Sequence, residues 1–180
     1  MLYNRMDPKQ VIGQYFEGYV RVIFDLVCTG KKELPDLVSK DGLFYVEVKS
    51  SNGGSVIKEA QLKRFNEITD ARRSYALCFH PLTNIEETCP EEGGLIYALN
   101  TCEKYVYLFP FSVIKAHFEA GPKQTYREAD GFVHFRQNQA RDIFDKNVDA
   151  WDRLGLDMSD YNTESDCPRI YILKRKMLSS

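Results

Sequence analysis

The clearest pattern of hydrophobic and polar positions lies in two short alternating runs, at residues 36–40 and 43–51, separated by Asp41-Gly42. Asp-Gly between apolar, β-branched runs is typical of a two-residue type I′ hairpin turn, because glycine accepts the positive φ that this turn requires. The pattern therefore predicts a β-hairpin with Asp41 and Gly42 as its loop.

The register of this hairpin gathers charged side chains on one face. Pairing outward from the turn places Asp36 opposite Glu47, with Cβ atoms roughly 4.5–5.5 Å apart. Because strand side chains alternate, Glu47 and Lys49 share one face, whereas Val46 and Val48 point toward the core. The polar face therefore holds two acids and one base.

Two carboxylates this close repel each other unless a cation lies between them. Oxygen ligands favour Mg²⁺ or Mn²⁺, and Mg²⁺ keeps coordination positions open for water and a substrate phosphate. The hairpin therefore predicts a divalent metal site for phosphodiester chemistry. The alternative is a solvated hairpin edge on which acids and a lysine alternate without function.

An amphipathic helix is predicted before the hairpin, over residues 8–28. Asp7 is its expected N-cap, Pro8 its first residue, and Gly30 lies just past its end. Its apolar stripe consists of Ile12, Phe16, Val20, Ile23 and Val27. Glu17 borders the stripe, where it either faces the metal site or forms an exposed i,i+4 ion pair with Arg21.

A second helix is predicted after the hairpin, over residues 56–71, with Ser55 as its N-cap. Gln61 occupies a position on its inner face where the periodicity favours an apolar residue. An inward polar group needs partners, so we expect Gln61 to reach Lys49 or a metal-bound water. The alternative is a partly exposed glutamine at the edge of this face.

The order of these features resembles the PD-(D/E)XK nuclease superfamily, most nearly its archaeal Holliday junction resolvase and Mrr-type restriction branches. The likeness covers about residues 8–80. The residues that carry it are Gly13-x-x-x-Glu17, Pro35-Asp36, Glu47-Val-Lys49-Ser50-Ser51 and Gln61. The resemblance implies an α/β fold, a restriction-endonuclease-like core in which helices flank a mixed central β-sheet.

The resemblance also implies roles for individual residues. The implied metal ligands are Glu17, Asp36, Glu47 and the backbone carbonyl of Val48, with Lys49 as the catalytic lysine and Gln61 as the glutamine of several branches. We expect Lys49 to act first as a cation that stabilises negative charge on the phosphorane, although a role as general base stays open. Junction-resolving relatives work as symmetric dimers, so a homodimer is compatible with this assignment.

The length of 180 residues and a hydrophobic content of 43% fit one domain, with a core over about residues 8–110 and a C-terminal elaboration over about 111–180. Further strands are predicted at residues 75–79, 95–99, 105–109, 132–135 and 169–173, and further helices at 112–121 and 137–154. The remaining residues carry no motif that would narrow the substrate.

The net charge of −2 argues against a general electrostatic attraction to nucleic acid. Any DNA-binding surface must therefore be local. The predicted phosphate contacts are Lys58, Lys63, Arg64, Arg72 and Arg73. Solvated charges on a helix face are the alternative explanation for this group.

Several classes of function are not indicated. The sequence shows no signal-peptide pattern, no apolar run of transmembrane length and no glycine-rich phosphate loop, so we expect a cytoplasmic protein without a membrane or nucleotide partner. The five cysteines include no Cys-x-x-Cys pair, and this pattern indicates reduced thiols. Cys28 and Cys78 are expected in the core, and the spacing around His80 matches no standard zinc site.

These observations predict a Mg²⁺- or Mn²⁺-dependent nuclease that hydrolyses DNA, an endonuclease of restriction, repair or recombination type. Two alternatives stay open: a catalytically inactive nuclease fold that binds DNA or serves in an assembly, and a nuclease that processes RNA.

Overall fold

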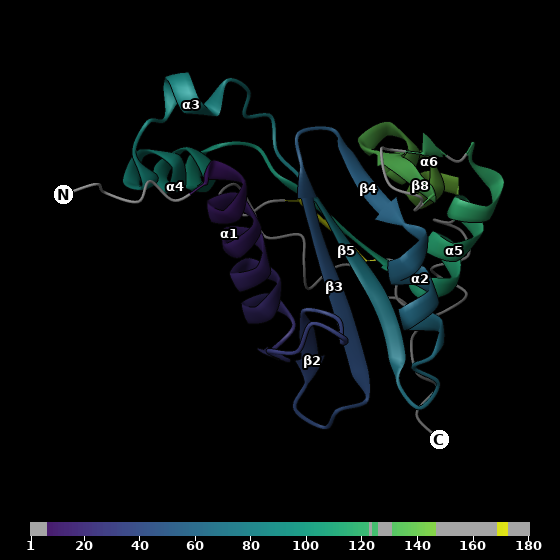
Figure 1. Cartoon of the computed structure of the whole chain (residues 1–180). Helices are drawn as coiled ribbons and strands as arrows, with labels where there is room; N and C mark the ends of the chain where they lie inside the picture. The colour runs from purple at the N-terminus through teal and green to yellow at the C-terminus, as the bar shows by residue number, and fades with distance from the viewer. Residues whose placement is uncertain (1–6, 123, 126–130, 147–168, 173–180) are drawn as a thin grey trace.

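The computed structural model describes residues 7–122, 124–125, 131–146 and 169–172, which form a mixed α/β fold (Figure 1). In chain order, the elements are α1 (Pro8–Ile23), β1 (Leu26–Cys28), β2 (Leu37–Ser39), β3 (Phe44–Ser51), β4 (Gly54–Lys58), α2 (Glu59–Asn66), β5 (Arg72–Phe79), α3 (Ile85–Thr88), α4 (Glu92–Thr101), β6 (Tyr105–Pro110), α5 (Phe111–Ala120), β7 (Gln124–Thr125), β8 (Gly131–Arg136), α6 (Gln137–Lys146) and β9 (Arg169–Ile172). Of the helices in these residues, none has the length and apolar character needed to cross a membrane.

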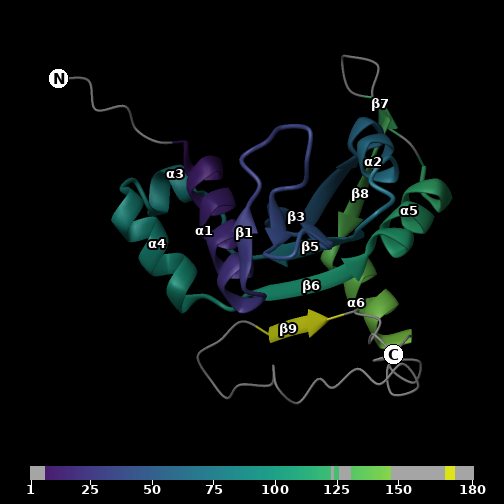
Figure 2. The ribbon, with the colours of Figure 1, turned by 90° about the horizontal axis from the view of Figure 1, so that it is seen from below.

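A central sheet has the strand order β1-β2-β3-β5-β6-β9, and a smaller sheet has the order β4-β8-β7. In the central sheet, β3 pairs in parallel with β5, and β6 with β9, whereas the other neighbours are antiparallel. Helices α1, α3 and α4 lie on one side of this sheet, and α2, α5 and α6 lie on the other with the small sheet (Figures 1 and 2). The predicted mixed sheet flanked by helices is confirmed.

Each face of the central sheet has its own hydrophobic core. Helices α1 and α4 cover one core, in which Phe16, Val20 and Leu37 are fully buried. Helices α2, α5 and α6 cover the other, which is rich in aromatic side chains such as Tyr75 and Phe109. A strand covered on both faces is apolar nearly throughout, as the buried run from residue 74 to residue 79 shows.

The register of the predicted hairpin is confirmed, but its turn type is wrong. Val38 pairs with Tyr45, which is the predicted register. The loop spans residues 40–43 rather than two residues, and Gly42 N donates to Ser39 O at 2.8 Å. Gly42 has a φ of 74°, whereas Asp41 keeps a negative φ, so the turn is not type I′. The Asp41 carboxylate instead accepts from Leu43 N at 3.0 Å and from the Ser39 hydroxyl, which stabilises the wider loop.

The predicted first helix begins where expected but ends early. Pro8 is its first residue, and the side chain of Asp7 accepts from Lys9 N at 3.0 Å. The helix ends at Ile23 instead of residue 28, and Asp25 then adopts a φ of 51°. The chain reverses there, and residues 26–28 become strand β1. Val27 is consequently 41% exposed rather than part of the helical stripe.

Two further segments differ in type from their predictions. Residues 54–58 form β4, which pairs with β8, so the second helix starts at Glu59, and Ser55 lies buried in the strand instead of capping it. The strand predicted at residues 95–99 is part of helix α4, because Leu95 and Leu99 recur at i,i+4 and both face the core. The strands predicted near residues 75–79, 105–109, 132–135 and 169–173 are confirmed. The predicted helix over 137–154 is described as far as Lys146, and its remainder lies outside the described residues.

Candidate active site

Four of the predicted site residues, Asp36, Glu47, Lys49 and Gln61, converge where β2 and β3 adjoin, beside the start of α2. Asp36 immediately precedes β2, Glu47 and Lys49 are two residues apart on β3, and Gln61 is in the first turn of α2. Helix α2 directly follows β4 and lies on the same side of the central sheet as β4 (Figure 1). The hairpin register therefore brings Asp36 and Glu47 together, as predicted.

Each of the two acids accepts a hydrogen bond from the backbone at or next to the other acid. Asp36 N donates to Glu47 Oε2 at 3.3 Å, and Val48 N donates to Asp36 Oδ2 at 2.9 Å. Each carboxylate is thus anchored to the backbone of the segment that carries the other. This reciprocal arrangement holds the two carboxylates near each other.

The other Glu47 oxygen accepts two further hydrogen bonds. Lys49 Nζ donates to Glu47 Oε1 at 2.9 Å, and Gln61 Nε2 donates to the same oxygen. The inward orientation expected for Gln61 is confirmed, but its amide contacts Glu47 directly rather than Lys49. Lys49 keeps 28% of its side chain exposed and so retains access to solvent.

Burial destabilises the ionised form of the Glu47 carboxylate. The residue is only 6% exposed. Burial raises the pKa of Glu47, the positive charge of Lys49 opposes this shift, and the negative charge of Asp36 adds to it. A cation bound beside the two acids would relieve this penalty, since it favours the ionised form of both.

Glu17 lies near Asp36 but outside the hydrogen-bonded group. Burial, and then the charge of Asp36, raise the pKa of Glu17, and its Oε1 accepts from the Cys28 thiol at 3.6 Å. Arg21 lowers that pKa without forming a salt bridge to Glu17 among the described residues. Glu17 as a metal ligand therefore stays a prediction. The expectation that Cys28 is a core residue is wrong, because its thiol is exposed, whereas Cys78 is fully buried as expected.

The donor atoms suit a hard divalent cation. Among the described residues, none donates to Asp36 Oδ1, and a carboxylate pair offers more acceptor sites than the bonds above occupy. Carboxylate oxygens are the ligands that Mg²⁺ prefers. Within the same part of the chain, no three His, Cys, Asp or Glu side chains form a metal-binding group, so Glu17 does not complete a cluster of three acids with Asp36 and Glu47.

Four of the five predicted phosphate contacts are exposed. Lys58, Lys63, Arg64 and Arg72 all lie on the surface. Arg73 differs, because its guanidinium donates to the backbone carbonyl of Phe65 and lies 4.4 Å from the centroid of the Phe111 ring. Arg73 thus joins the end of α2 to α5, and in this conformation its guanidinium stabilises the fold.

We expect Arg73→Ala to lower the free energy of unfolding by about 2 kcal/mol, from the lost charged hydrogen bond and cation–π contact. Chemical denaturation measures this loss. Arg72→Ala is the matched control, because Arg72 is the exposed neighbour and its removal should change stability by less than about 0.5 kcal/mol. Equal stability of the two variants would contradict the structural role of Arg73.

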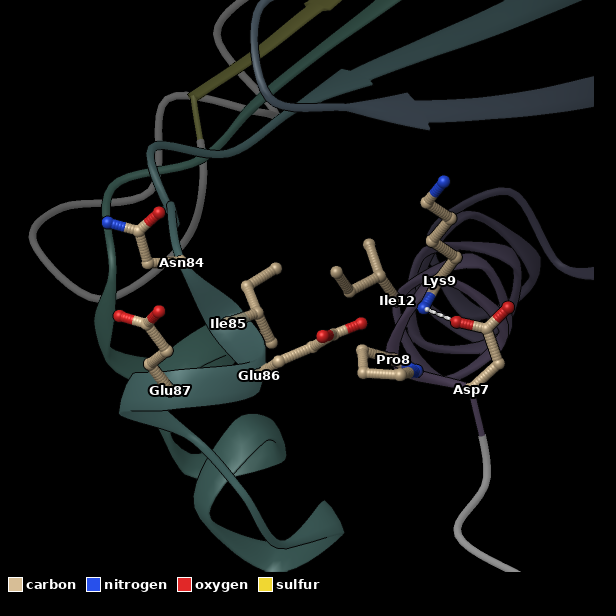
Figure 3. A pocket seen from close by; sticks show the side chains of 8 residues that line it. All are labelled: Asp7, Pro8, Lys9, Ile12, Asn84, Ile85, Glu86 and Glu87. Atoms are coloured by element: carbon tan, nitrogen blue, oxygen red, sulfur yellow. Dashed lines mark hydrogen bonds between the residues drawn. The ribbon is translucent and has the colours of Figure 1, made fainter.

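A pocket lies apart from this group, between the start of α1 and α3 (Figure 3). Its lining residues are Asp7, Pro8, Lys9, Ile12, Asn84, Ile85, Glu86 and Glu87. Ile12 of α1 and Ile85 of α3 point toward each other across it, and the Glu86 side chain extends between the two helices (Figure 3). It contains neither a buried charge nor a paired acid and base, so we place the candidate active site at Glu47.

One contributor to the site, Tyr75, is absent from the sequence predictions. Its hydroxyl donates to Gln61 Oε1 at 3.4 Å. The available signal is a tyrosine on a strand that is otherwise apolar, because a buried phenol needs a hydrogen-bond partner. The strand was correctly predicted, but the sequence does not show which element faces it.

Comparison of the chain with models of known families, with curated proteins and with solved structures finds no match.

Proposed function

We propose that the protein is a Mg²⁺-dependent nuclease that hydrolyses DNA phosphodiester bonds, with the restriction-endonuclease-like core that its resemblance to the PD-(D/E)XK superfamily implies. One observation carries this proposal. Glu47 accepts from Asp36 N and Asp36 accepts from Val48 N, while Lys49 contacts Glu47 at 2.9 Å, so two acids and a base lie close together on the hairpin.

Asp36 and Glu47 would hold the cation, with Val48 contributing its carbonyl oxygen and Glu17 approaching from α1. Bound Mg²⁺ would polarise the scissile phosphate and lower the pKa of a water ligand. The protein supplies two hard oxygen donors on a rigid hairpin, and rigid elements hold such groups in a defined geometry. Gln61 supports them by donating to Glu47.

Lys49 would place a positive charge beside the reacting phosphate. Its ammonium group is partly exposed, so a phosphate can approach it, and its contact with Glu47 fixes its direction. A fixed cation stabilises negative charge that develops at the reacting phosphate. Lys49 can also donate a hydrogen bond to the attacking water and orient it.

The exposed bases near α2 would bind the DNA backbone. Lys63 and Arg64 lie on that helix, Lys58 directly precedes it, and Arg72 begins the strand that follows. A local group of this kind is needed because the whole chain carries a net charge of −2. Phosphate contacts of this kind would make binding weaken steeply as salt concentration rises.

Incubation of the full chain with supercoiled plasmid tests the proposed activity. We expect nicked and linear DNA in Mg²⁺ or Mn²⁺, and intact plasmid in EDTA. A parallel reaction with structured RNA separates the DNA nuclease from the RNA-processing alternative. Intact plasmid in both metals, with or without RNA cleavage, would contradict the proposed DNA hydrolysis.

A second candidate, a nuclease fold without turnover, is favoured by a different observation. Lys49 neutralises the charge of Glu47, and Gln61 donates a hydrogen bond to it. These side chains therefore stabilise Glu47 without a bound cation. In that case the hairpin would serve DNA binding or assembly only. Salt-sensitive DNA binding without cleavage in any divalent metal would support this candidate over the first.

A further inference from the structure

A fully buried tyrosine lies beside the candidate site on the neighbouring strand. Tyr75 of β5 is directly paired with Glu47 of β3 in the parallel ladder, and it has 0% exposure. Its ring packs against Phe65, with 5.1 Å between the ring centroids. A buried phenol hydroxyl needs a hydrogen-bond partner, and this one donates to Gln61 Oε1 at 3.4 Å.

Tyr75, Gln61 and Glu47 form a chain of two hydrogen bonds, in which Tyr75 donates to Gln61 and Gln61 donates to Glu47. Burial, followed by the charge of Glu47, raises the pKa of Tyr75 far above its usual range, so the hydroxyl keeps its proton and acts as a donor. An ionised carboxylate can only accept, so the Gln61 amide must turn its NH₂ group toward Glu47. The amide oxygen then faces Tyr75, and the hydroxyl stabilises that orientation against a flip.

We propose that Tyr75 is a positioning residue that acts through Gln61 to hold the Glu47 carboxylate in its ligand orientation. Tyr75 itself touches neither metal nor substrate. Groups behind a metal ligand commonly fix its direction, and their loss typically weakens metal binding about 10- to 100-fold. The role of this contact in catalysis rests on the proposed nuclease function, whereas the contact itself does not.

Tyr75→Phe tests the inference, because it removes the hydroxyl and keeps the ring that packs on Phe65. Titration of the full chain with MgCl₂ alone should show about tenfold weaker binding than wild type. If Tyr75 acts through Gln61, the same change in a Gln61→Leu background should alter the affinity less than twofold. Tyr107→Phe, which removes a hydroxyl from the same core, is the matched control and should bind Mg²⁺ as wild type does.

A second measurement uses the metal-free protein. We expect the side-chain amide NMR signals of Gln61 to shift and to exchange faster with solvent in Tyr75→Phe, but to stay unchanged in Tyr107→Phe. A purely structural effect would move both variants alike, because both lose a buried hydroxyl.

The outcomes separate this inference from the proposed function. Unchanged Gln61 signals in Tyr75→Phe, or an equal loss of affinity with and without Gln61, would overturn the positioning role whatever the nuclease assay gives. Shifted signals and coupled affinities in a protein that leaves plasmid intact would support the positioning role while the proposed function fails. A wild-type chain without Mg²⁺ affinity would overturn both.

Discussion

Lys49→Ala should lower the rate of plasmid nicking by about 10²- to 10³-fold, the usual effect of removing one charge-stabilising donor from an active site. Asp36 and Glu47 remain, so the variant should still bind Mg²⁺. Single-turnover nicking with protein in excess measures the rate, and a thermal melt with and without Mg²⁺ checks folding and metal binding.

Lys40→Ala is the matched control for Lys49→Ala. Lys40 belongs to the same hairpin and also contacts an acid, Asp25, at 2.9 Å, but this pair is highly exposed. Exposed ion pairs contribute little, so the control should nick plasmid at the wild-type rate. A Lys49→Ala variant that folds, binds Mg²⁺ and nicks within a few-fold of wild type would contradict the catalytic role of this lysine.

Glu47→Gln should abolish both nicking and the stabilisation of the fold by Mg²⁺. A cation that binds only the folded state stabilises it, by about 1.4 kcal/mol at a concentration ten times the Kd. The amide keeps the shape of the side chain but removes the charge that holds the cation. Denaturant unfolding with and without MgCl₂ measures this difference.

The same variant has a pH signature whose sign follows from burial. The pKa of Glu47 is raised in the folded protein, so the unfolded chain ionises first as the pH rises. Without metal, wild type should therefore lose stability relative to Glu47→Gln as the pH rises from the ordinary glutamate range to the raised value. Saturating Mg²⁺ should reverse this trend, because metal binding requires the ionised form.

Glu67→Gln is the isosteric control, because Glu67 is exposed at the end of α2. It should respond to pH and Mg²⁺ as wild type does. If the stability difference between wild type and Glu47→Gln is independent of both pH and Mg²⁺, burial does not raise the pKa of Glu47 and Glu47 is not a metal ligand.

The proximity of Asp36, Glu47 and Lys49 was predictable from sequence because it is local. Asp36, Glu47 and Lys49 lie within one hairpin, and alternation from the turn places them even though the turn is wider than predicted. The register survives because one face of the hairpin must bury Leu37 and Val46, and a one-residue shift would expose both.

Other features depended on partners far along the chain. Residues 26–28 extend an apolar helical stripe, and only pairing with β2 shows that they form a strand. Ile57 fits a helix face equally well, and its strand is specified by pairing with Val133 of β8. The contact between Tyr75 and Gln61 likewise requires knowing that α2 packs over β5.

The central claim is that Asp36 and Glu47 jointly hold one divalent cation beside Lys49. Anomalous diffraction from crystals of the full chain soaked in Mn²⁺ tests it most directly. We expect an anomalous peak within about 2.2 Å of one carboxylate oxygen of each acid, close to the Mg²⁺ distance. A saturating soak that places Mn²⁺ on other residues, or on only one of these two acids, would contradict the claim.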